Sequence, residues 1–235
     1  MQHSIRQYRF STAWTVLAIL GIISLSTPSA TQAKIYKNPV VDYGAGKYAV
    51  GVDTGSMSRD YTSAGLGDDT VDSTLTVVNI TIGVGDNGAL GLHYGSASGS
   101  VGGGTALPGT GGGLSYRMAL DPPGKDLRKG LLLSHFWGYV GDDFTGVYYG
   151  QSDAMFGMSK ALNKTTNLYF GGGLSLATLT LEMYTAPYYT YEANGSSSIG
   201  GFAGVDIALS PQILAGLELH LIHESGVGLY VDMRF

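Results

Sequence analysis

"GVGLYVDMRF", residues 226–235, alternates along its whole length. Apolar side chains occupy the odd positions from Val227 to Phe235, while glycine, tyrosine, aspartate and arginine occupy the even ones. A period of two is the pattern of a β-strand with two unlike faces. The stretch therefore predicts an extended strand with one apolar face and an aromatic side chain as its last residue.

The same alternation recurs in nine other stretches of the chain. Most set apolar side chains on one parity against mostly glycine, serine, alanine or isolated charges on the other, while the stretch 130–140 has apolar residues on both parities. In one of them Leu75 and Val77 fall on the parity opposite to Val78, so we expect a β-bulge near Val77–Val78. The pattern predicts about ten strands, or about eight or twelve if the region 131–153 is misread. The nine stretches are 46–56, 74–84, 89–96, 113–120, 130–140, 154–162, 167–179, 198–209 and 213–223.

The connections between these stretches alternate between short and long. Asn, Asp, Gly and Pro, the residues that tight turns use, fill the short connections. An up-and-down meander with its short turns at one end gives such an alternation. The short connections are 85–88, 121–126, 163–166 and 210–212. The long ones are 57–70, 97–113, 141–153 and 184–198, and the last connection on that side, "ESG" at 224–226, is short.

The composition places these strands in a membrane. Charged residues make up 13% of the chain, well below the roughly 25% of soluble domains, and there are 37 glycines and no cysteine. The formal net charge of −5 excludes a basic footprint for nucleic acid. A sheet with an apolar outer face and a small, polar inner face fits a closed barrel in lipid, where no strand edge can stay unpaired. The sequence therefore predicts an all-β, transmembrane, antiparallel up-and-down barrel.

In its final strand the chain resembles the small single-chain β-barrels of bacterial outer membranes. Proteins of that family commonly end in Phe after alternating apolar residues, and the ending resembles the signal that the barrel-assembly machinery reads. Here Leu229, Val231, Met233 and Phe235 match, with Met233 where an aromatic is often found. The resemblance implies a Gram-negative outer membrane, export through the periplasm, and outer-membrane lipids and the assembly machinery as partners.

The first 33 residues have the features of a secretory signal peptide. Arg6 and Arg9 precede an apolar run at 13–25, and small residues lead to a cleavage site after Ala33. An uncleaved anchor is the alternative, although the run is shorter than the roughly 20 residues of a spanning helix. We therefore expect a signal peptide at 1–33, a periplasmic segment at 34–45 and the barrel at 46–235.

The last hairpin predicts a polar cluster in the lumen. A three-residue loop at 224–226 pairs Leu221 with Leu229, Leu219 with Val231 and Leu217 with Met233 on the outside. On the inside it places His220 beside Tyr230 and Glu218 beside Asp232, with Arg234 one diagonal step away. We interpret this cluster as a salt-bridged filling of a narrow barrel. Its predicted members are Arg117, Glu218, His220, Tyr230, Asp232 and Arg234.

Several motifs suggest other chemistry. "GVGDNG" at 83–88 matches a dinucleotide-binding pattern, but no helix follows it, so we interpret it as a turn. His223 and Ser225 have the spacing of outer-membrane lipid A deacylases, and Asp142-Asp143 with His135 are a faint hint of an outer-membrane barrel protease. The histidines are too scattered to indicate a metal site, and no cofactor is expected.

The function expected from the sequence is therefore non-enzymatic. The leading hypothesis is a barrel that acts as a scaffold and contacts an unknown extracellular ligand through its long loops. A narrow passive pore is the alternative. Ten strands enclose little free space, because about eight already fill with side chains, but the small inner residues leave more room than usual. An envelope enzyme is the third hypothesis. The candidate surface contacts are Tyr184, Tyr188, Tyr189 and Tyr191.

Overall fold

The computed structural model describes residues 35–40, 43–63, 67–185, 187–195, 198–221 and 224–235, and the predicted signal peptide lies outside them. Eleven β-strands make one sheet in which every pairing is antiparallel. Within this described part, the chain forms no helix long and apolar enough to cross a membrane. The strands are β1 (Tyr48–Ser63), β2 (Gly67–Val84), β3 (Gly88–Val101), β4 (Leu107–Ala119), β5 (Leu127–Gly141), β6 (Thr145–Ala161), β7 (Thr166–Met183), β8 (Tyr189–Gly195), β9 (Ile199–Ala208), β10 (Ile213–Leu221) and β11 (Ser225–Arg234).

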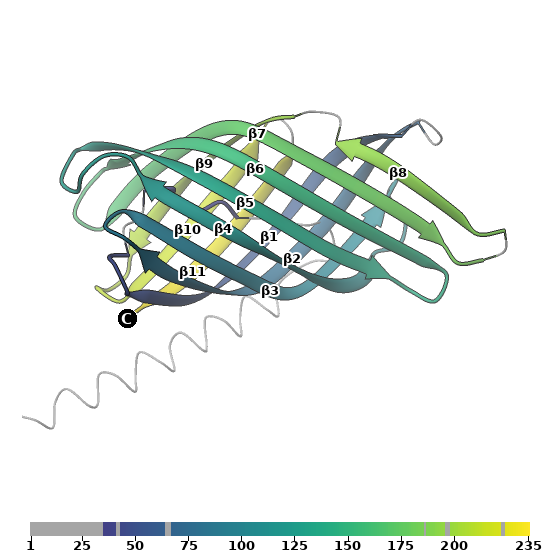
Figure 1. Cartoon of the computed structure of the whole chain (residues 1–235), viewed down its shortest axis with the longest axis horizontal. Helices are drawn as coiled ribbons and strands as arrows, with labels where there is room; N and C mark the ends of the chain where they lie inside the picture. The colour runs from purple at the N-terminus through teal and green to yellow at the C-terminus, as the bar shows by residue number, and fades with distance from the viewer. Residues whose placement is uncertain (1–34, 41–42, 64–66, 186, 196–197, 222–223) are drawn as a thin grey trace, which may run out of the picture.

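The sheet closes on itself. Strands pair in chain order, and β11 pairs with β1 over ten residue pairs from Ala49↔Arg234 to Ser58↔Ser225. The strands β8 and β9 act as two halves of one wall strand, because both pair with β7, at Thr178↔Asn194 and Leu174↔Ile199. The result is a closed antiparallel barrel of ten wall strands, which confirms the predicted fold. Figure 1 shows the strands winding round in sequence, with the C-terminus at one end of the barrel and β8 towards the other.

The outer face of the barrel is apolar, as predicted. On β2, Val78, Ile80 and Ile82 point outward and are 44–54% exposed. On β10, Leu217 and Leu219 also point outward and are 39% and 46% exposed. We call this outward ring of apolar side chains the belt. Its other members include Tyr48, Val50, Val84, Leu90, Leu92, Tyr94, Leu114, Leu131, Leu133, Phe156, Leu168, Phe170, Leu174, Leu176, Ile199, Ile207, Leu221, Val227 and Leu229.

The expected β-bulge in β2 is wrong. The register of β2 against β1 and β3 runs without a break through Leu75, Val77 and Val78. Leu75 and Val77 are 3% and 2% exposed, so both point into the lumen. The inner face of the barrel is therefore apolar at this level. The apolar residues change parity between Val77 and Val78 because the lining of the lumen changes from polar to apolar there.

The four long connections are also largely wrong as loops. Most of their residues continue the strands: β1 runs to Ser63 and β2 begins at Gly67, while β3 runs to Val101 and β4 begins at Leu107. Beyond the belt, the outward face meets water instead of lipid, so hydrophobic alternation stops while backbone pairing continues. The strands thus project as a barrel extension past the belt, and Figure 1 shows β7 and β8 reaching furthest at that end.

The last hairpin keeps its predicted faces but not its predicted register. Leu217 pairs with Leu229 and Leu219 with Val227, a shift of four residues from the expected pairs. The structure pairs Tyr230 with Gly216, and a Cβ on Gly216 would collide with the Tyr230 ring. The fit of the Tyr230 ring over Gly216 is a tertiary constraint. The register predicted from a three-residue loop did not take it into account.

Candidate functional site

The lumen at the end of the barrel where β1 begins is filled by the chain's own residues. We call residues 35–40 and 43–44 the plug segment. It was expected to be periplasmic, and the structure places it inside the barrel. All its side chains before Gly44 are buried, and the most buried of them are Ile35, Tyr36, Lys37, Asn38, Val40 and Tyr43, at 2–5% exposure.

Lys37 anchors the plug segment to two carboxylates on adjacent strands. Its Nζ lies 2.7 Å from Asp53 Oδ1 on β1 and 2.7 Å from Asp232 Oδ1 on β11. The Tyr43 hydroxyl donates to Asp232 Oδ2 at 3.3 Å, and Asn79 Nδ2 donates to Asp53 Oδ1 at 2.7 Å. A buried ammonium between two carboxylates is stable only because each partner compensates the others' lost hydration.

Tyr36 makes the second attachment, to β10 and the hairpin that follows it. Its backbone N–H donates to Glu218 Oε1 at 2.7 Å, and its ring stacks on His220 with centroids 4.7 Å apart. The His220 imidazole lies between two carboxylates, with Nε2 2.6 Å from Glu218 Oε1 and Nδ1 2.8 Å from Glu224 Oε1. The Tyr36 hydroxyl also donates to Glu224 Oε1 at 3.3 Å.

Asn38 makes the third attachment, to β6 and β9. Its Nδ2 donates to Asp206 Oδ2 at 2.7 Å and to Ser159 Oγ at 2.9 Å, and its Oδ1 accepts the backbone N–H of Val40 at 3.0 Å. The Tyr230 hydroxyl donates to the other oxygen of Asp206. Three consecutive residues of the plug segment therefore bind side chains from opposite parts of the wall.

Charge explains why the lumen needs the plug segment. Among the described residues, six buried carboxylates share the interior with three buried Lys or Arg side chains and two buried histidines. Unpaired buried charges are costly, so each added cation stabilises the barrel. The carboxylates are Asp53, Asp153, Asp206, Glu218, Glu224 and Asp232, and the strong bases are Lys37, Arg59 and Arg117.

The predicted lumen cluster is present but divided. Glu218 and His220 form one group with Glu224, while Asp232 belongs to the Lys37 group. The expected neighbours Glu218 and Asp232 do not pair, because their partners across the hairpin are Gly228 and Leu214. His220 likewise pairs with Gly226, and Tyr230 lies opposite Gly216 instead.

The two predicted arginines lie around a residue that the sequence analysis did not single out. Arg117 and Arg234 sit over the Tyr43 ring, at 5.5 Å and 5.3 Å from its centroid. Six other residues of the site were not predicted from the sequence: Tyr36, Lys37, Asn38, Asp53, Asp206 and Glu224. A signal existed for Asp53 and Asp206, which both fall on the inward parity of their strands and call for a cation.

The remaining candidates are distributed over the surface. Tyr184, Tyr188 and Tyr189 are 37%, 77% and 48% exposed, and Tyr191 is partly buried with its ring 6.0 Å from that of Tyr189. At the C-terminus Phe235 is exposed and stacks on Tyr48 at 5.0 Å. Leu229 faces outward, while Val231 is 7% exposed and Met233 is half-buried.

The deacylase hint lies partly outside the described residues, and the protease hint does not come together as a site. His223 lies outside the described residues, and Ser225 is exposed at the start of β11. Asp142 Oδ1 accepts the backbone N–H groups of Phe144 and Thr145, both at 2.8 Å, so it caps the turn after β5. His135 instead bonds Ser152 at 2.9 Å on the outer face. In the described part of the chain, no group of His, Asp and Glu side chains is arranged to hold a metal ion.

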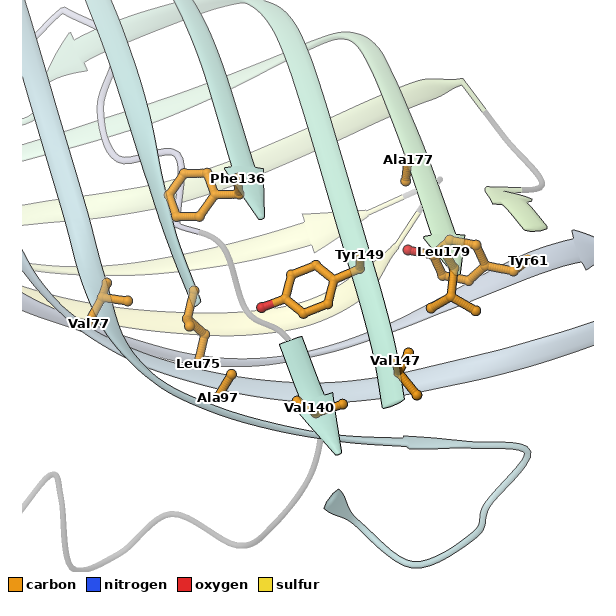
Figure 2. Packing of buried hydrophobic residues seen from close by; sticks show 10 residues of the cluster. All are labelled: Tyr61, Leu75, Val77, Ala97, Phe136, Val140, Val147, Tyr149, Ala177 and Leu179. Carbon is orange, nitrogen blue, oxygen red and sulfur yellow. The ribbon is translucent and has the colours of Figure 1, made fainter. Parts of the chain in front are cut away.

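The opposite half of the lumen contains an apolar cluster. Ten buried side chains form a cluster there, and Figure 2 shows Phe136, Leu75 and Tyr149 meeting from different strands. Beside it lies a cavity of about 220 Å³, which we call the mouth cavity. The cluster comprises Tyr61, Leu75, Val77, Ala97, Phe136, Val140, Val147, Tyr149, Ala177 and Leu179.

A closed ten-strand barrel with an apolar outer belt is the architecture of small bacterial outer-membrane β-barrels. No protein-family model matches the chain, and no curated protein matches it in sequence. Solved structures similar to it include the attachment invasion locus protein Ail of Yersinia pestis, at 8% identity over 81% of this chain and 99% of that one, with a TM-score of 0.37.

Two further solved structures are similar to the chain. The translocator domain of the autotransporter NalP from Neisseria meningitidis is 13% identical over 83% of this chain and 90% of that one, with a TM-score of 0.46. An outer membrane channel from Pseudomonas putida F1 is 10% identical over 87% of this chain and all of that one (100%), with a TM-score of 0.38. The assignment to the barrel class rests on the closed sheet and its belt.

Proposed function

We propose that the chain is an integral protein of a bacterial outer membrane, closed by its own plug segment, that acts at the end projecting beyond the belt. The observation that carries this proposal is Lys37, buried between Asp53 and Asp232 inside the barrel. A lumen occupied in this way is not an open passage for solutes. The working surface is then the projecting end of the barrel, as in the scaffold hypothesis.

The belt supports the placement in lipid. Outward side chains such as Leu176 and Ile199 are 64% and 59% exposed, and a face of this kind is stable only against hydrocarbon. The wall strands on either side of the closure, β1 with 16 residues and β11 with 10, are long enough for the roughly 9–11 residues of a tilted spanning strand. Export through the periplasm and insertion by the barrel-assembly machinery are part of this proposal.

Aromatic side chains at the projecting end support a contact role. Phe144, Tyr184, Tyr188 and Tyr189 are all exposed there, at the ends of β5, β7 and β8. Tyr offers a large contact area with few rotatable bonds and a hydroxyl for hydrogen bonding. These exposed aromatic side chains would bind an extracellular ligand.

A gated pore is a second candidate, and one observation favours it. The plug segment lies before β1 and is no strand of the sheet, so its withdrawal would leave the wall intact. In this version the attachments of Lys37, Tyr36 and Asn38 form a latch, and release of the latch opens the lumen.

Single-channel recording in planar bilayers tests the proposal. The wild-type protein is expected to show no conductance steps, because the plug segment fills the lumen. In Lys37→Met the plug segment loses its ion pairs, and intermittent steps are expected. Lys125→Met is the matched control, because Lys125 also pairs with an aspartate, Asp121, at 2.6 Å, but is 55% exposed. Steady, full-size steps from the wild-type protein would contradict the closed-barrel proposal.

A further inference from the structure

The exposed charges of the barrel are divided by sign between its two ends. All exposed lysines among the described residues lie at the end where β1 begins, which we call the plugged end. At the projecting end, every exposed charged side chain of the described part is a carboxylate. A lipid with a negatively charged headgroup is therefore favoured at the plugged end. The exposed lysines are Lys47, Lys125, Lys129, Lys160 and Lys164, and the exposed carboxylates of the projecting end are Asp60, Asp68, Asp69, Asp142, Asp143 and Glu192.

Two of these lysines lie on the lipid-facing side of the wall. Lys129 is the third residue of β5, and Lys160 is the last but one of β6, so both lie at the edge of the belt. Lys129 has the outward parity of Leu131, and Lys160 has that of Phe156. A lysine at such an edge keeps its aliphatic chain on the apolar surface and extends its ammonium group to the level of the lipid headgroups.

The register of β5 and β6 brings the two lysines together. Lys129 pairs with Met158 and Lys160 with Leu127, so the two lysines are diagonal neighbours on adjacent strands. Diagonal neighbours in an antiparallel pair lie roughly 7–8 Å apart, so both ammonium groups can reach one phosphate. Lys160 also lies between Leu127 and Leu168, which are 44% and 42% exposed. A ligand at this place therefore meets two positive charges and an apolar wall.

The ammonium groups of Lys129 and Lys160 have no partner in the protein. In the described part of the chain, no carboxylate oxygen lies within 4.0 Å of either Nζ. Both oxygens of Asp121 are already bonded: Oδ1 lies 2.6 Å from Lys125 Nζ, and Oδ2 accepts the backbone N–H of Lys129 at 2.9 Å. The charge of the two ammonium groups is therefore available to an anion from the membrane.

We propose that Lys129 and Lys160 bind the phosphate of an anionic glycerophospholipid, such as phosphatidylglycerol, in the leaflet at the plugged end. The acyl chains of this lipid lie against the belt residues Leu131 and Phe156. A zwitterionic lipid binds less tightly, because the lysines repel the positive charge of its headgroup. The site does not depend on whether the lumen is closed, since both lysines lie on the outer face of the wall.

Native mass spectrometry in a neutral detergent tests the site, through the Kd of the first lipid bound. Wild type is expected to bind phosphatidylglycerol more tightly than phosphatidylcholine with the same acyl chains. Lys129→Met and Lys160→Met should each weaken phosphatidylglycerol binding about fivefold, the effect of one lysine near an anionic membrane surface, and leave phosphatidylcholine binding unchanged. Lys125→Met is the matched control, because Lys125 is exposed at the same end but pairs with Asp121. Heat-modifiable mobility on gels verifies that the variants are folded barrels.

Two further measurements separate charge from shape and lipid from free phosphate. Lys129→Arg keeps the charge and should retain the preference for phosphatidylglycerol. Glycerol 3-phosphate, which has the phosphate but no acyl chains, should not displace the lipid at an equal concentration. Equal Kd values of the wild type for the two lipids, or the same loss in Lys125→Met as in Lys129→Met, would overturn the proposal. Displacement by glycerol 3-phosphate would overturn the assignment of the ligand as a lipid.

Discussion

The two halves of the lumen are filled in different ways. In the plugged half, buried carboxylates are matched by donors from the plug segment, and Lys37 alone serves two of them. In the mouth, mostly apolar side chains line the wall and leave a cavity, and the buried hydroxyl of Tyr149 has no hydrogen-bond partner among the described residues. Polar groups require partners with fixed geometry, whereas apolar walls accept an occupant by shape. The plugged half is therefore committed to one arrangement, whereas the mouth retains empty space.

The same packing device occurs in both halves, which makes the comparison direct. An inward tyrosine covers a glycine on the next strand at Tyr230–Gly216 in the plugged half and at Tyr149–Gly138 in the mouth. The Tyr230 hydroxyl is hydrogen-bonded to Asp206, while the Tyr149 hydroxyl has no hydrogen-bond partner in the part of the chain that the structure describes. A tyrosine that is held at both ends cannot move, and one that is held only by packing can.

Removing the cation of the plugged half should have the largest effect on stability. Lys37→Met leaves Asp53 and Asp232 buried without their ammonium, which should lower the free energy of unfolding by about 3–5 kcal/mol. Urea-induced unfolding in lipid vesicles, followed by tryptophan fluorescence, measures it. Lys125→Met removes an exposed ion pair and should cause no measurable change. Equal losses from the two variants would show that Lys37 is not buried among charges.

Truncating one leucine in each half should give unequal losses. Leu132 is 1% exposed and belongs to the buried cluster of Tyr36, Tyr169 and Phe202, so Leu132→Ala should cost about 3–4 kcal/mol. Leu179 already borders the mouth cavity, so Leu179→Ala leaves less new empty space and should cost about 2 kcal/mol. The same unfolding assay compares them. A larger loss for Leu179→Ala would contradict the description of the mouth as loosely packed.

The smallest effect should come from adding one methyl group under each tyrosine. The added methyl group of Gly216→Ala displaces the Tyr230 ring, which the hydrogen bond to Asp206 holds in place. The free energy of unfolding should fall by about 1–3 kcal/mol. Gly138→Ala should cost less than about 1 kcal/mol, because the Tyr149 ring can shift towards the mouth cavity. Equal costs would show that Tyr149 is as rigidly held as Tyr230.

The sequence by itself determined which side chains face lipid. Alternation is a local property of extended backbone, so the outward positions of Val78, Leu217 and Leu229 could be predicted without knowing any partner strand. The inward positions of Glu218 and Asp232 followed from the same parity. The predicted up-and-down barrel is confirmed even though the long connections are largely strand, because a sheet in lipid must close.

Only the tertiary structure decided what fills the lumen. Lys37 and Asp232 are 195 residues apart in sequence, and Tyr36 and Glu218 are 182 apart, so no local pattern links them. The register of the last hairpin depended on the fit of Tyr230 over Gly216, which requires both strands in place. The strand ends beyond the belt could not be predicted from the sequence, because backbone pairing continues there after the hydrophobic alternation has stopped. Contact with lipid requires an apolar side chain at every second residue of a strand, which is visible in the sequence. The packing of the lumen depends on contacts between segments that are distant in sequence.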